Sequence, residues 1–167
     1  MMREHSVYGK FMCLDIGDKC IGVALSDEKR VVARAYGDLH NRNGVFDQIY
    51  DIVQKENVGT IVVGWPLELS GRAGRQCEKV YSFVSALDAR LLSFYEHTEQ
   101  STDVTLVADD VRCSSPAIVL IDERYSTRAV MGVMRSAQLN RKKRTVHKDV
   151  CAAIYILQIF LDMYGRR

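Results

Sequence analysis

The order of strand-like and helix-like segments is the feature that most constrains the fold of this chain. Residues 10–17 (KFMCLDIG), 20–27 (CIGVALSD) and 31–36 (VVARAY) are short, largely apolar and separated by only a few polar residues. Segments of this kind indicate β-strands, and connections this short join antiparallel neighbours. The chain is therefore expected to open as an antiparallel meander of three strands.

Helix and strand segments alternate after this meander. They are expected as a helix beginning near Asn43, a strand at 60–64, a helix through Cys77 and Leu87, a strand at 116–124, a helix capped by Ser126 or Thr127, and a final helix from about Val146 to Tyr164. The run TIVVG at 60–64 is typical of a central strand with helices on both sides. The pattern predicts an α/β fold, a mixed sheet with helices on both faces.

A single domain over residues 1–167 is expected, because this length can bury a core without disulfides or metals. Residues at about 96–115 are mostly polar and fit neither neighbouring element. They are interpreted as a surface insertion. No repeat or long linker divides the chain.

Composition and cysteine usage indicate a cytoplasmic protein. No apolar run approaches the roughly 20 residues of a membrane span, and the N-terminal residues lack the apolar core of a signal peptide. The five cysteines are scattered and form no CxxC pair. This usage favours reduced thiols and argues against a zinc site or a disulfide framework.

Basic residues are concentrated in one segment. Residues 124–148 contain eight Lys or Arg and no Asp or Glu, whereas the remaining chain carries 15 basic and 21 acidic residues. A basic segment against an acidic background is expected of a surface that meets a polyanion. The alternative is an ordinary solvated helix and loop.

Two acidic residues stand at the ends of predicted core strands. Asp15 ends the first strand, where alternation places it on the face of Phe11 and Cys13. Glu123 ends the strand at 116–124 on the face of Ile121. If the two strands are neighbours, both carboxylates meet at the same edge of the sheet.

A third acid, Asp149, opens the final helix on its apolar side. Ala152, Ala153 and Ile156 follow it by three, four and seven residues, spacings that share one helix face. The carboxylate therefore points toward the protein body, and a helix packed across the two strands would bring it to Asp15 and Glu123.

Three converging carboxylates repel one another unless a cation compensates them. A hard divalent ion with oxygen ligands does so, and Mg²⁺ or Mn²⁺ can activate water for phosphodiester cleavage. Each acid alone has another explanation: Asp15 can shape a turn, Glu123 can pair with Arg124 or Arg128, and Asp149 can stabilise a helix N-terminus. The agreement of the three placements favours a metal site.

Four motifs resemble those of the YqgF/RuvX family. They are LDIGDKCIGVALSD, IVVGWPLELSGRAG, IDERYST and RKKRTVHKDVCAAIYILQIFLD, in this order. The family is described as bacterial proteins with a ribonuclease-H-like fold, as Holliday junction resolvases, and as nucleases that mature the 5′ end of precursor 16S ribosomal RNA. The resemblance covers most of the chain except roughly residues 88–116.

The resemblance implies specific roles for matching residues. The metal-binding acids of the family fall on Asp15, Glu123 and Asp149, which are then also the catalytic residues, with Mg²⁺ or Mn²⁺ as cofactor. Nucleic-acid contacts are expected from the basic residues of the motifs and of the basic segment: Lys19, Arg72, Arg75, Arg124, Arg128, Arg141, Lys142, Lys143, Arg144 and Lys148. Arg72 and Arg75 can equally be ordinary exposed arginines, and His147 is left out of the catalytic set.

Two departures from the family pattern stand out. Cys20 follows the lysine of the first motif, where the family usually has arginine, so a possible phosphate contact is absent. The link before the strand at 116–124 is also longer than usual, which leaves open whether it is inert or alters access to the sheet edge.

The expected function is a divalent-metal-dependent nuclease acting on structured RNA, with precursor 16S ribosomal RNA favoured. Cleavage of branched DNA and a non-catalytic nucleic-acid-binding module are the alternatives. Ribosomal particles are a conceivable partner, no membrane is expected, and the chain is expected to be a monomer or weak dimer.

Overall fold

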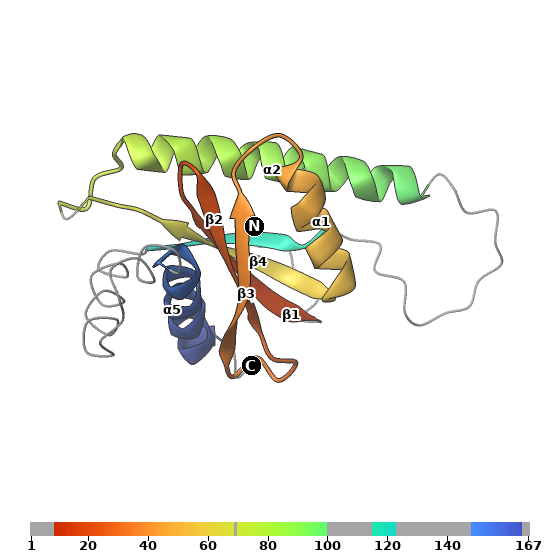
Figure 1. Ribbon diagram of the computed structural model, residues 1–167, viewed down its shortest axis with the longest axis horizontal. Helices are drawn as coiled ribbons and strands as arrows, with labels where there is room; N and C mark the ends of the chain where they lie inside the picture. The colour runs from red at the N-terminus through yellow and green to blue at the C-terminus, as the bar shows by residue number, and fades with distance from the viewer. Residues whose placement is uncertain (1–8, 69, 100–114, 123–147, 165–167) are drawn as a thin grey trace.

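The computed structural model describes residues 9–68, 70–99, 115–122 and 148–164. These ranges form five strands and three helices: β1 (Lys10–Ile16), β2 (Cys20–Ser26), β3 (Ala33–His40), α1 (Val45–Lys55), β4 (Val58–Trp65), α2 (Arg75–Glu99), β5 (Ala117–Asp122) and α5 (Lys148–Tyr164). The sheet has the order β3-β2-β1-β4-β5 (Figure 1). β1, β2 and β3 are antiparallel neighbours, and β4 runs parallel to both β1 and β5. The predicted mixed sheet with an opening meander is confirmed.

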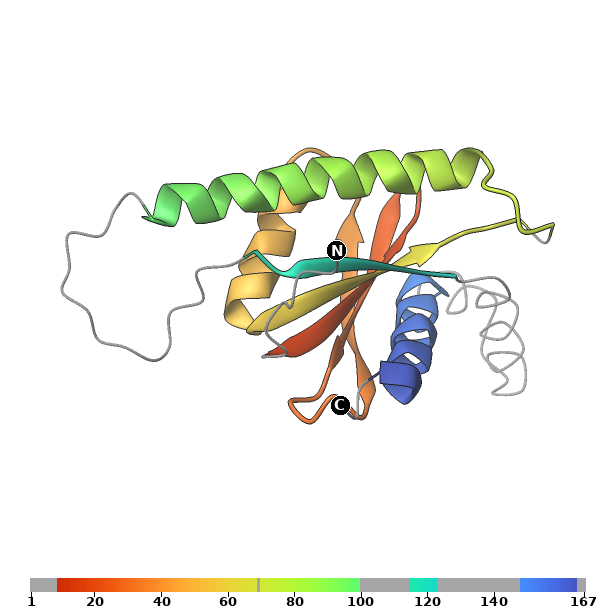
Figure 2. The same ribbon diagram turned by 180° about the vertical axis from the view of Figure 1, so that it is seen from behind.

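Helices cover both faces of this sheet, as predicted. Met12, Leu14 and Ile16 of β1 point into one core with α1 and α2. Phe11 and Cys13, the alternate residues, point into a second core with α5. The separation of α5 from the other two helices is visible from both sides (Figures 1 and 2). Strand alternation therefore sends the side chains of β1 into two different cores.

α5 buries the face that its sequence predicts. Ala152, Ala153 and Ile156 are at most 2% exposed, and they follow Asp149 by the expected helical spacings. The side chain of Gln158 in α5 accepts a 3.0 Å hydrogen bond from the amide of Ala33, the first residue of β3. In the part of the chain that the structure describes, no helix combines the length and the hydropathy needed to cross a membrane.

α2 is longer than its apolar pattern through Leu87 suggested. It continues to Glu99 and so includes the first residues of the predicted insertion at 96–115. The extension packs against α1, where Phe94 stacks on Tyr50 with ring centroids 4.1 Å apart. The helix predicted after Ser126 or Thr127 lies outside the described residues.

Candidate functional site

Asp15 and Asp149 lie close together on the α5 face of the sheet. Asp15 is directly opposite Gly22 in the β1–β2 pair, and the first turn of α5 lies against that glycine. A Cβ atom on Gly22 would overlap the backbone carbonyl of Asp149 and lie 2.7 Å from the amide nitrogen of Val150. The glycine thus permits the close approach that places Asp149 beside Asp15.

The electrostatics of Asp15 reflect this arrangement. Its pKa is raised from 3.8 to about 6, chiefly because burial disfavours the charged carboxylate and secondly because Asp149 adds a like charge. Lys148 acts in the opposite direction and lowers the pKa. In the described ranges no salt bridge ends on either carboxylate. Among the described residues, the charge of Lys148 is thus opposed by burial and by Asp149, and the raised pKa of Asp15 shows that the latter two prevail.

This donor set fits a hard divalent cation. Two neighbouring carboxylates supply the oxygen ligands that Mg²⁺ and Mn²⁺ prefer, and a cation between them would offset both the burial of Asp15 and the repulsion by Asp149. The third predicted ligand, Glu123, lies outside the described residues. Within those residues no group of three His, Cys, Asp or Glu side chains could hold a metal ion, so the three-acid site stays a prediction.

The strand predicted to carry Glu123 is described as far as Asp122, and it is not the direct neighbour of β1 that the sequence argument took as its condition. β5 pairs with β4 and not directly with β1, so the strands of Asp15 and of the predicted Glu123 are separated by one strand. Val119 and Ile121 pack against the α5 core. Both residues are thus on the face of the sheet that carries Asp15.

The turn between β1 and β2 lies next to the acid pair. The amide of Gly17 donates a 3.0 Å hydrogen bond to the carbonyl oxygen of Cys20. A Cβ atom on Gly17 would lie 2.7 Å from that oxygen and 3.9 Å from Oδ2 of Asp149. Cys20, which replaces the arginine usual in the family motif, is partly buried and lies 3.9 Å from Nδ1 of His40.

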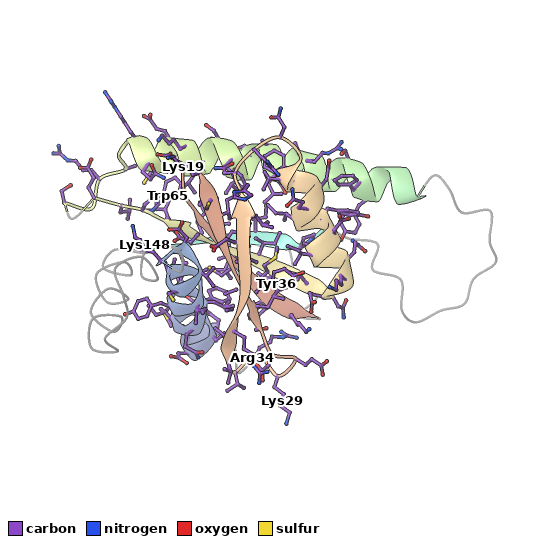
Figure 3. All side chains as sticks on the ribbon, in the orientation of Figure 1. Lys19, Lys29, Arg34, Tyr36, Trp65 and Lys148 are labelled. Carbon is purple, nitrogen blue, oxygen red and sulfur yellow. The ribbon has the colours of Figure 1, made fainter. Side chains whose placement is uncertain are left out.

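Four of the ten predicted nucleic-acid-binding residues lie in the described ranges. Lys19 and Lys148 are exposed, and Figure 3 shows them on the same side of the molecule as Trp65. Arg72 and Arg75 are exposed in and after the loop that follows β4. The other six, Arg124, Arg128, Arg141, Lys142, Lys143 and Arg144, lie outside the described residues. The four described cations carry their charge in solvent, as a phosphate-binding residue must.

Three residues that shape this region were absent from the predicted site. Gly22 had a sequence signal, because a glycine inside a strand often marks the close approach of another backbone. Asn41 and Gln76 had none. They contact the β1–β2 turn from distant segments, the Asn41 side chain donating to the carbonyl oxygen of Gly17 at 2.8 Å and that of Gln76 to Ile16 at 3.4 Å.

A comparison with solved structures agrees with the fold. The solved structure described as "T. thermophilus RuvC in complex with Holliday junction substrate" matches with a TM-score of 0.50 at 14% identity, covering 95% of this chain and 98% of the other. At this identity the likeness concerns the fold alone. The sheet order, the helices on both faces and this match define a ribonuclease-H-like α/β protein.

The sequence comparisons assign the family. The family model described as "RuvX: Holliday junction resolvase" matches residues 9–163. A protein of Ehrlichia chaffeensis is 34% identical over 156 residues, covering 92% of this chain and 85% of the relative. One of Staphylococcus aureus strain JH9 is 31% identical over 166 residues, covering 96% and 98%. Both are named "Putative pre-16S rRNA nuclease". The chain belongs to the RuvX family, also called YqgF, as its motifs predicted.

Proposed function

We propose that this chain is a divalent-metal-dependent nuclease that hydrolyses phosphodiester bonds of structured RNA and matures the 5′ end of precursor 16S ribosomal RNA. The observation that carries the proposal is the proximity of Asp15 and Asp149. The charge of Lys148 acts on Asp15, but no salt bridge among the described residues ends on either carboxylate. Such a pair costs folding energy, which is difficult to explain as a device for stability alone.

Asp15 and Asp149, with Glu123 as the predicted third ligand, are the residues that would hold Mg²⁺ or Mn²⁺. When bound, the metal would activate water and stabilise the leaving oxygen. Asp15 must be deprotonated to act as a ligand, so its raised pKa ties metal binding to pH. Lys148, next to Asp149 at the start of α5, is exposed and placed to hold a phosphate of the substrate.

The choice of RNA rests on relatives. The names of the relatives from Ehrlichia chaffeensis and Staphylococcus aureus refer to precursor 16S ribosomal RNA. The description of the family model refers to the Holliday junction instead, which supports cleavage of four-way DNA as the second candidate. The two acids do not discriminate between these substrates, because selectivity for RNA depends on contacts with the 2′-hydroxyl.

The test compares cleavage of precursor 16S ribosomal RNA and of a four-way DNA junction by the purified protein in Mg²⁺ or Mn²⁺. Asp149→Asn removes one carboxylate, and Asp51→Asn, at an exposed position of α1, is the matched control. We expect cleavage of the RNA to fall about 100-fold or more in Asp149→Asn and to stay unchanged in Asp51→Asn.

Other outcomes would redirect the proposal. Metal-dependent cleavage of the junction but not of the RNA would favour the DNA candidate. Salt-sensitive binding of RNA by all three proteins, with cleavage by none in either metal, would replace the enzyme by a non-catalytic binding module or require a ribosomal particle as partner.

A further inference from the structure

A groove of about 560 Å³ lies at the β1–β2 turn, beside the first turns of α2. This volume is within the range of about 300–1,000 Å³ common to small-molecule sites. Its lining includes Ile16, Gly17, Asn41, Gln76, Lys79 and Phe83. Arg75 is the one lining residue that belongs to the metal-binding or nucleic-acid-binding set predicted from the sequence.

The groove lies next to the acid pair, because its lining residues Ile16 and Gly17 directly follow Asp15 in the sequence. Ile16 follows Asp15 directly in β1 and points into the core of α1 and α2, away from the α5 face. Gly17 lines the groove and would bring a Cβ atom to within 3.9 Å of Oδ2 of Asp149. The turn therefore separates the acids from the groove by about one residue. A nucleic-acid strand with one phosphate bound beside Asp15 and Asp149 could place a neighbouring nucleotide in the groove.

Two amide side chains give the groove a defined hydrogen-bonding character. Asn41 donates through Nδ2 to the carbonyl oxygen of Gly17 at 2.8 Å, and Gln76 donates through Nε2 to that of Ile16 at 3.4 Å. A backbone carbonyl can only accept, so these contacts fix which end of each amide is nitrogen. Oδ1 of Asn41 and Oε1 of Gln76 then remain as acceptors, and no donor among the described residues reaches either oxygen.

The remaining lining suits a base better than a phosphate. Phe83 packs edge-on against Phe46 with ring centroids 5.0 Å apart, which fixes an apolar surface beside Ile16. Lys79 is already paired with Asp18 at 2.6 Å. Arg75 is opposed by Glu78 in the same lining, so the groove has no net excess of positive charge.

We propose that this groove binds an unpaired nucleotide adjacent to the cleaved bond of the substrate strand, and that Asn41 and Gln76 accept hydrogen bonds from its base. The inference rests on the proposed function and adds a substrate class to it, RNA with an unpaired flank at the cleavage site. Guanine is the expected base, because its N1–H and exocyclic amino group present two donors side by side. Sequence-specific RNA recognition commonly reads unpaired bases in this way.

The experiment measures binding of short RNA duplexes to the wild-type protein in buffer without divalent metal, so that no cleavage is needed. The duplexes are blunt or carry a short overhang on either strand, ending in guanine or in inosine, which lacks the exocyclic amino group. We expect the guanine overhang to bind about 5- to 10-fold tighter than the blunt duplex, and inosine to lose about 2- to 10-fold, the effect of one hydrogen bond.

Three variants test whether the preference for guanine over inosine arises in the groove. Gln76→Leu removes one acceptor and should reduce the guanine–inosine ratio toward one. Gln48→Leu, at an exposed position of α1, is the matched control and should keep the ratio. Ser82→Trp fills the groove from an exposed position of α2 without changing any contact to the β1–β2 turn. It should abolish the preference even if Gln76→Leu does not fold.

The outcomes separate this inference from the nuclease proposal. Equal affinity for all duplexes, or an equal weakening of all of them by Gln76→Leu, would overturn the groove as a nucleotide site even if the protein cleaves RNA. A guanine preference lost in Ser82→Trp would support the groove even if no RNA is cleaved in Mg²⁺ or Mn²⁺.

Discussion

Asp15 lies at the candidate site and carries an energetic cost. Its carboxyl is partly buried next to Asp149, and both effects raise its pKa to about 6. A protein selected only for stability would replace such a group by a neutral one. The cost is understandable if a cation binds there, because the bound state removes the repulsion that the unbound state suffers.

The raised pKa predicts how stability depends on pH. The folded state holds the Asp15 proton more tightly than the unfolded state, whose pKa is 3.8, so without metal the free energy of unfolding should fall as pH rises from about 4 to about 6. Asp15→Asn removes this dependence and should stabilise the metal-free protein by about 1–3 kcal/mol at pH 8.

Urea denaturation at pH 5 and pH 8, with and without Mg²⁺, measures this effect. Mg²⁺ should stabilise the wild-type protein at pH 8 but not Asp15→Asn, since binding to the folded state alone raises its stability. An equal response of both proteins to Mg²⁺ would exclude Asp15 as a metal ligand.

The positions of Asp15 and Asp149 were predictable because local periodicity determines the face of a strand or helix. Gly22 gave a signal for the close approach of another backbone, but the contributions of Asn41 and Gln76 were not predictable, because each depends on a segment distant in the sequence. Gln76, for example, contacts a carbonyl 60 residues earlier in the chain. No local pattern encodes such a contact.

At the level of elements, the relative position of the two acids depends on the packing of α5 against β2. The helix backbone at Asp149 rests on Gly22, the strand residue directly opposite Asp15. This packing leaves no volume for a side chain. The position of Asp149 relative to Asp15 is therefore controlled by a residue with no functional group.

Gly22→Ala should displace the first turn of α5, because the added methyl group overlaps the backbone of Asp149. We expect a loss of about 1–3 kcal/mol in stability, typical of overpacking, and a loss of RNA cleavage at temperatures where the variant is still folded. Thermal denaturation and kcat/KM, measured together, distinguish the two effects. Full activity in a folded variant would contradict the role given to this contact.

The β2–β3 connection contains Asp27, whose pKa is shifted in the opposite direction to that of Asp15. Oδ1 of Asp27 accepts hydrogen bonds from the amides of Val31 at 2.7 Å and Val32 at 3.0 Å. These bonds lower the pKa of Asp27 below 3.8. Its contribution to stability is therefore present above pH 3.8 and is lost as pH falls through the lowered pKa of the folded state.

Asp27→Asn should thus be less stable than the wild-type protein at pH 7, and the difference should shrink below pH 3.8 as the wild-type carboxylate is protonated. Urea denaturation at pH 7 and pH 3 measures the difference. Asp51→Asn, again as control, should show no comparable change. A difference that is constant with pH would mean that charge has no part in these hydrogen bonds.

Elements were more predictable than their ends. The strands follow from apolar runs, whereas α2 extends beyond the predicted stripe that ends at Leu87. Leu91, four residues later, is fully buried, and Tyr95 accepts a 2.8 Å hydrogen bond from Gln54 of α1. The apolar stripe of α2 therefore continues beyond Leu87 through Leu91 and Tyr95, and this part of the helix packs against α1.

At the level of the whole molecule, exposed lysines lie at both ends of β2. Lys19 lies at the β1–β2 turn near the acids, and Lys29 lies at the β2–β3 turn at the other end of β2, as Figure 3 shows. Both lysines are exposed, so they form a matched pair for testing which end meets the nucleic acid.

Lys19→Glu should weaken RNA binding and reduce the slope of log affinity against log salt by about 0.7–0.9, the value for one phosphate contact. Lys29→Glu should leave both quantities unchanged. Fluorescence anisotropy over a salt series measures them. Equal effects of the two substitutions would indicate non-specific attraction in place of a defined path along the acid end.

The position of α5 also bears on when the protein becomes active during its synthesis. Asp15 belongs to β1 and Asp149 to α5, so the pair cannot form until the start of α5 has left the ribosome. Domains fold as synthesis proceeds from the N-terminus, and a nascent chain can complete its meander before α5 exists. Under the proposed function, a nascent chain that has completed only its meander lacks Asp149 and cannot yet hold a metal at the two-acid site.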